Sequence, residues 1–142
     1  MAPWFPTALG AAFFISAHYL LLRAASGRID DRVGALVLES SAALGITVSL
    51  AFAGRGSGDS ATRAGVLFAV GSGLAVSVAS VLLFTTLRRG GPVASTGTIV
   101  LGGGVALSAL VAPWLFAESF TGRRVLGVAL GLAAMWVLGG ES

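Results

Sequence analysis

The amino-acid sequence predicts an all-α integral membrane protein with five transmembrane helices, and three observations support this. The 142 residues are 56% hydrophobic and only 11% charged, so a water-soluble domain would expose more apolar surface than water tolerates. Five apolar stretches have close to the length of about 20 residues that a helix needs to cross roughly 30 Å of hydrocarbon. The 21 glycines follow no collagen period and are typical of closely packed membrane helices. The length fits one small domain.

Polar connections separate the expected helices. The N-terminal segment "MAPWFPTALGAAFF" has no basic residues before its apolar stretch, so we expect it to be kept as part of the first helix and not removed as a signal peptide. The connections "RAASGRIDDR", "GRGSGDSATR", "RRGGP" and "ESFTGRR" contain the residues that end a membrane helix and hold its boundary in water. The fifth helix is short, and the arginines at its start can snorkel to the interface. The expected spans are residues 4–22, 33–53, 64–87, 93–117 and 122–139.

Small residues recur at every fourth position within the expected helices. Such ridges let helix backbones approach closely, either inside one chain or between subunits. We expect most of this packing to lie within one chain, with the fifth helix as the preferred subunit interface. The expected packing positions include Gly65, Gly73, Gly104, Gly127 and Gly131.

The composition argues against several classes of function. All nine basic residues are arginines, which lie in clusters between apolar runs, where they face lipid headgroups. The sequence has no basic stripe with interleaved aromatic residues, so we expect no nucleic-acid partner. Cysteine is absent, which excludes disulfides and thiolate chemistry. We find no phosphate loop, metal-ligand cluster or paired carboxylates, and therefore expect no enzyme, no metal and no cofactor.

The arginines also bear on the orientation of the chain. Five spans place the termini on opposite sides of the membrane. The connections on one side carry Arg23, Arg28, Arg32, Arg88 and Arg89, and those on the other carry Arg55, Arg63, Arg123 and Arg124. This near balance gives almost no preferred orientation under the positive-inside rule. It arises either by chance or because the chain inserts both ways round, and we predict dual topology.

Dual topology has a direct test in intact cells. A cysteine introduced near each terminus is expected to be labelled from outside at both positions, because part of the population would expose each end. The measurement is labelling with a membrane-impermeant thiol reagent. A terminus that is never labelled would contradict the prediction.

Two ionisable residues lie well inside the expected spans, where such groups are costly and are functional candidates. His18 is five residues before Arg23, and Glu39 is six residues after Val33, so both lie roughly 7 to 9 Å from the same membrane side at 1.5 Å per residue. We expect them at similar depth on neighbouring helices, where they bind a cation or take and release a proton as the substrate leaves. The alternatives are a structural polar pair or a Glu39 that snorkels to the interface.

Other residues have a candidate role in binding or in a turn. Tyr19, beside His18, and Trp114 can stack on an organic cation, although for Trp114 lipid or core packing is at least as well supported. Glu118 lies beyond the fourth span and three residues before Thr121, whose hydroxyl is a suitable N-cap for the fifth helix. We therefore expect Glu118 to close a turn rather than to act as the working acid.

The second half of the chain resembles a known family. "TLRRGGPVAS" and the ending "LFAESFTGRRVLGVALGLAAMWVLGG" resemble the EamA-type repeat of the drug/metabolite transporter superfamily. The segment "ISAHYLLLR" is similar to the family's first helix, with His18 at an Asn-like position and Arg23 at the basic one. The resemblance thus extends over nearly the whole chain.

This resemblance has implications for assembly and function. Members of the family usually carry two five-helix repeats of opposite orientation, and such inverted repeats work by alternating access around a midplane site. A chain with one EamA-like repeat implies an antiparallel homodimer, or a heterodimer with a related small protein, in the inner (cell) membrane. The implied activity is secondary transport, mainly export, of a small metabolite or drug-like compound. The alternatives are a non-transporting accessory or structural subunit and a component of a lipid-carrier flippase.

Overall fold

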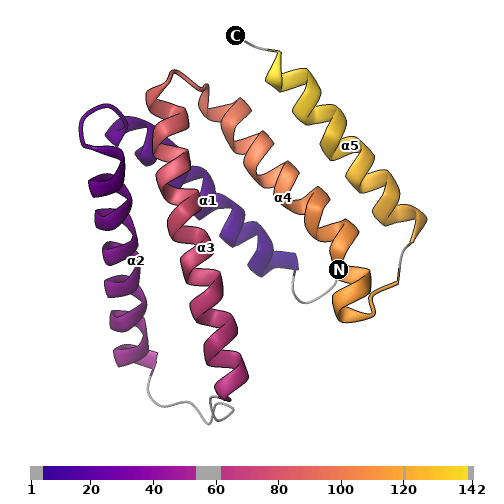
Figure 1. The fold of residues 1–142 in the computed structure, drawn as a ribbon, viewed down its shortest axis with the longest axis horizontal. Helices are drawn as coiled ribbons and strands as arrows, with labels where there is room; N and C mark the ends of the chain where they lie inside the picture. Colours follow the sequence, from indigo (N-terminus) through magenta and orange to yellow (C-terminus); the bar gives the residue numbers. More distant parts are fainter. Residues whose placement is uncertain (1–4, 54–61, 120, 141–142) are drawn as a thin grey trace. The chain divides into compact units, whose positions relative to one another are not determined.

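The computed structural model describes residues 5–53, 62–119 and 121–140, and five helices account for most of them (Figure 1). All five are long and apolar enough to cross a membrane, which confirms the prediction of an all-α chain with five candidate spans. Residue 4, the expected start of the first span, and most of the second connection lie outside the described residues. The helices are α1 (Phe5–Ala25), α2 (Asp31–Ala53), α3 (Arg63–Arg88), α4 (Val93–Phe116) and α5 (Gly122–Gly139).

The start of α2 shows why some helix bounds differ from the expected ones. The Asp30 carboxylate accepts hydrogen bonds from the backbone N–H groups of Arg32, at 3.0 Å, and Val33, at 3.3 Å. These bonds satisfy two of the donors that the first turn of a helix leaves free. The helix therefore begins at Asp31, two residues before the expected start at Val33.

The chain divides into a first unit, residues 1–23 with 89–142, and a second unit, residues 24–88, which we describe separately. In the second unit, α2 and α3 pack side by side. Phe84 and Leu87 of α3 are only 2% and 0% exposed. A Cβ atom on Gly34 of α2 would lie 2.8 Å from two ring atoms of Phe84, so this position accepts only glycine without a shift of the ring.

In the first unit, α4 packs against α5, and Gly102 and Gly103 of α4 lie close to α5. A Cβ atom on Gly102 or Gly103 would lie 3.2 or 3.4 Å from the Met135 side chain. A Cβ atom on Gly104 or Gly127 would meet no other atom within 4 Å in the described part of the chain.

Two of the three remaining expected packing positions are similarly open among the described residues. Gly73 and Gly131 would also meet nothing within 4 Å among the described residues, and Gly65 would meet only the Thr62 hydroxyl at the start of its own helix. A Cβ atom at Gly73 or Gly131 would therefore meet no described atom, whereas one at Gly65 would need the Thr62 hydroxyl, 3.0 Å away, to shift.

Large apolar side chains cover the helix surfaces in both units. Phe13 is 71% exposed, Phe68 is 79% exposed and Trp136 is 84% exposed. Exposure of this extent is unfavourable in water and is expected where the surrounding solvent is lipid.

Candidate functional site

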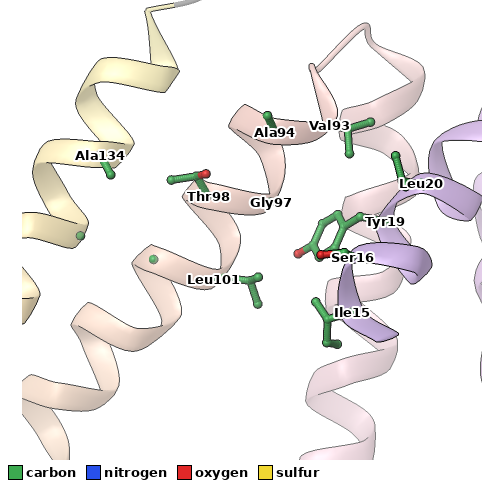
Figure 2. A pocket seen from close by; sticks show the side chains of 12 residues that line it. Ile15, Ser16, Tyr19, Leu20, Val93, Ala94, Gly97, Thr98, Leu101 and Ala134 are labelled. Atoms are coloured by element: carbon green, nitrogen blue, oxygen red, sulfur yellow. The ribbon is translucent and has the colours of Figure 1, made fainter. Parts of the chain in front are cut away.

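A cleft of about 620 Å³ lies among α1, α4 and α5 in the first unit (Figure 2). Its volume is within the range of small-molecule sites, which is about 300 to 1,000 Å³. On one side, α1 contributes Ile15, Ser16, Tyr19 and Leu20. The opposite wall is mainly α4, with Gly97, Thr98 and Leu101 among its lining residues, and α5 completes it with Gly131 and Ala134.

Tyr19 is the only residue with an ionisable side chain among those that line the cleft. The other polar side chains are the hydroxyls of Ser16 and Thr98, and the rest of the wall is aliphatic or glycine. A mostly apolar wall with a few hydroxyl groups favours a small amphipathic molecule that makes few hydrogen bonds.

Gly97 allows the aromatic ring of Tyr19 to lie against the backbone of α4. A Cβ atom on Gly97 would be 3.8 Å from the ring, in ordinary van der Waals contact. Tyr19 is 6% exposed, and its ring points from α1 toward α4 (Figure 2). An alanine would therefore fit at position 97, whereas a larger side chain would occupy the cleft beside Tyr19.

The structure places the other candidates outside the cleft wall. His18 contacts Tyr19 edge to face, with ring centroids 5.5 Å apart, but it does not line the cleft. Trp114 is 91% exposed and is also absent from the lining. Of the residues predicted to bind substrate, the cleft contains only Tyr19.

Glu39 has a partner that sequence reasoning missed. Its carboxylate accepts a hydrogen bond of 2.6 Å from the hydroxyl of Ser80 on α3, a residue that is 6% exposed. Serine in a membrane helix commonly bonds its own backbone, as Ser77 does with the Gly73 carbonyl, so the sequence carried no signal for Ser80. Glu39 and His18 belong to different units, and their pairing stays a prediction.

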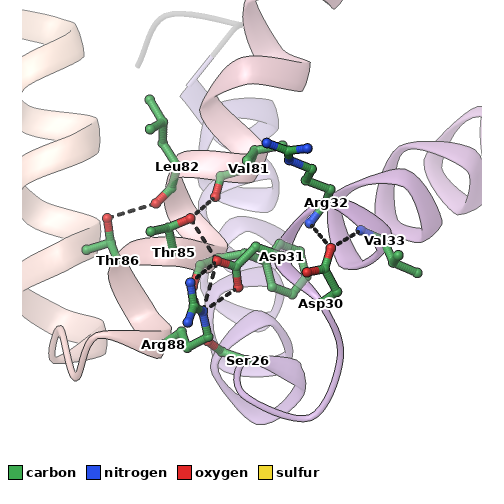
Figure 3. A network of polar contacts seen from close by, with 11 residues as sticks. Ser26, Asp30, Asp31, Arg32, Val33, Val81, Leu82, Thr85, Thr86 and Arg88 are labelled. Carbon is green, nitrogen blue, oxygen red and sulfur yellow. Dashed lines mark hydrogen bonds and ion pairs between the residues drawn. The ribbon is translucent and has the colours of Figure 1, made fainter.

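A second feature that the sequence did not reveal is a polar cluster of Asp31, Thr85 and Arg88 (Figure 3). Arg88 Nε donates to both Asp31 oxygens at 2.9 Å, and its Nη2 lies 2.8 Å from Oδ2. The Thr85 hydroxyl lies 2.9 Å from the same Oδ2 and 2.9 Å from the Val81 carbonyl oxygen. The Thr85 hydroxyl has one proton to donate, and the charged Asp31 carboxylate is a stronger acceptor than the Val81 carbonyl oxygen. The cluster joins the start of α2 to the end of α3.

The charges of this cluster also suit the helix ends that carry them. Asp31 lies in the first turn of α2, and Arg88 lies in the last turn of α3. A carboxylate is favourable near the partly positive N-terminus of a helix, and a guanidinium is favourable near the partly negative C-terminus. Asp31 is 8% exposed and is fully engaged by these partners, which is typical of a structural role.

Glu118 and Thr121 lie in the turn between α4 and α5. Thr121 is the N-cap of α5, and its side-chain oxygen accepts a hydrogen bond of 3.3 Å from the backbone N–H of Arg124. The carboxylate of Glu118 pairs with the Arg124 guanidinium. In the stretch of chain that the structure covers, no group of three or more His, Asp or Glu residues could hold a metal ion.

The length and apolar composition of its five helices are those of a multi-pass membrane protein. Several polar side chains within its helices bond either to their own helix or to a neighbouring one in the same unit. No protein-family model, curated protein or solved structure matches the chain.

Proposed function

We propose that this protein is the subunit of a secondary transporter of the drug/metabolite type, which moves a small amphipathic compound out of the cell. The observation that carries the proposal is the cleft of about 620 Å³ among three apolar helices, with Tyr19 in its wall. The nearly apolar lining supports a substrate that is itself mostly apolar. His18, which contacts Tyr19, and Glu39 are the candidates for coupling transport to a proton gradient.

The proposed working form is an antiparallel homodimer in the inner membrane. The resemblance to a single EamA-type repeat and the near balance of arginines between the two sides support this assembly. Small residues that meet no neighbouring atom within the described residues, such as Gly73 on α3, would allow a second copy to approach closely.

Transport can be measured with the purified chain alone in liposomes that contain DNA. Uptake of ethidium, an aromatic cation that fluoresces on binding DNA, is the readout under an imposed pH gradient. We expect Gly97→Leu to lower the initial rate about tenfold, because the added side chain occupies the cleft beside Tyr19.

Gly71→Leu is the matched control, since Gly71 lies on α3 and faces open space within 4 Å among the described residues. It should leave ethidium uptake near the wild-type rate. Equal uptake by the wild type and Gly97→Leu would remove the cleft from the mechanism. No uptake by the wild type would favour an accessory or flippase subunit instead.

A further inference from the structure

A second hollow in the first unit, which we call the α4–α5 groove, runs along these two helices and has a volume of about 1020 Å³. Gly104, Ser108 and Ala112 form part of its α4 wall, and Gly127 and Val128 belong to its α5 wall. At one end the lining changes from apolar to charged, with Glu118, Arg123 and Arg124. The groove therefore has an apolar length and a charged end.

The charged end has an excess of positive charge. Glu118 pairs with Arg124, and within the described residues no carboxylate forms an ion pair with Arg123. One terminal nitrogen of Arg124, Nη1, is buried and has no hydrogen-bond partner in the portion of the chain that the structure describes. Two guanidiniums and one carboxylate leave a net charge of +1 at this end, together with an unused donor.

The apolar part of the groove matches the depth of one leaflet. Its α4 wall extends from Ala112 to Val100, which is about 18 Å at 1.5 Å per residue. Half of a hydrocarbon core of roughly 30 Å is about 15 Å. An acyl chain would fit along the small residues of this wall while its headgroup stayed at the arginine end.

We propose that the α4–α5 groove binds one anionic phospholipid, with its phosphate on Arg123 and Arg124 and an acyl chain along the groove. Guanidinium groups match phosphate geometry, and basic pockets between membrane helices suit anionic headgroups. A helix from a second copy is the other possible occupant. It fits less well, because in an antiparallel dimer each charged end would face the apolar end of the partner.

The test is native mass spectrometry of the full chain, released from detergent after incubation with phosphatidylglycerol or phosphatidylcholine. The expected result is one retained phosphatidylglycerol and little phosphatidylcholine. Arg123→Gln, which breaks no ion pair among the described residues, should lower phosphatidylglycerol retention about fivefold. Arg89→Gln removes an equal charge outside the groove and should retain the lipid at the wild-type level.

A second variant tests the apolar part of the groove. Gly104→Leu adds a side chain that meets no described atom near its Cβ, so it should fill the groove without unfolding the helices and lower retention of the lipid. Gly10→Leu, on α1 and equally open, should have no effect. Equal retention of both lipids, or unchanged retention in Arg123→Gln or Gly104→Leu, would overturn the proposal. A dimer lost in Gly104→Leu with lipid retention unchanged would assign the groove to a second copy.

Discussion

Replacing Asp31 with alanine is expected to lower the free energy of unfolding by about 2 kcal/mol, within the range for charge-assisted hydrogen bonds. The variant loses the bonds from Arg88 and Thr85 to a carboxylate that is 8% exposed. It also loses a favourable charge in the first turn of α2. The Arg88 side chain is 53% exposed and reaches water, so no buried cation is left without a partner.

Removing the arginine of the pair instead is a sharper test of the polar cluster. Arg88→Ala leaves the buried Asp31 carboxylate with Thr85 as its remaining side-chain partner from the polar cluster, and stranding a charge costs more than removing it. We therefore expect Arg88→Ala to destabilise the protein more than Asp31→Ala. Unfolding in mixed micelles of mild and denaturing detergent measures the free energy of unfolding of both variants.

Glu118→Ala is a suitable control for Asp31→Ala, because it removes an ion pair with Arg124 in which the Glu118 side chain is 45% exposed. Exposed pairs contribute about 0.2 to 1 kcal/mol. If Asp31→Ala proved no more costly than Glu118→Ala, the polar cluster would not hold α2 and α3 together.

Replacing Gly34 with alanine is expected to destabilise the packing of α2 on α3 by about 2 kcal/mol, as overpacking of a tight interior commonly does. The new Cβ would lie 2.8 Å from the Phe84 ring and 3.2 Å from the Ile29 side chain. Phe84 is 2% exposed, so its ring has little room to move away, and the helices must separate instead.

Gly45→Ala is the matched control on the same helix, since a Cβ atom there meets nothing within 4 Å among the described residues. Alanine has the higher helix propensity, so this variant should be neutral or more stable by up to about 1 kcal/mol. Adding Phe84→Leu to Gly34→Ala should recover part of the lost stability by opening space. Similar unfolding of the Gly34 and Gly45 variants would show that α2 and α3 are not closely packed at Phe84.

Much of the secondary structure was predictable because it depends on local properties. A run of about 20 apolar residues crosses the hydrocarbon only as a helix, and this requirement identifies all five helices from the sequence. Helix ends were predictable where a local signal was read correctly, as with the Thr121 N-cap. The start of α2 differs from the expected one because Asp30 accepts hydrogen bonds from the first-turn N–H groups of Arg32 and Val33, which lets the helix begin within the charged connection.

The positions of helix contact were less predictable. A ridge of small residues indicates that another helix can approach closely there. It does not indicate which of several ridges on a helix contacts a neighbouring helix. Gly104 and Gly127 belong to such ridges, yet Gly102 and Gly103 are the glycines that lie against Met135. Neighbouring residues on one helix turn point about 100° apart, so a choice between them requires the rotation of each helix about its axis.

The sequence by itself therefore determined the class of protein, the five helices and the polar residues that are costly in lipid. Only the tertiary structure decided that Tyr19 lines a cleft with Gly97, that Ser80 bonds Glu39, and that Asp31 pairs with Arg88. The physical reason is the range of the interactions. Hydrophobic length and capping act within one segment of chain, whereas these contacts join residues 41 to 78 positions apart, whose meeting depends on how whole helices pack.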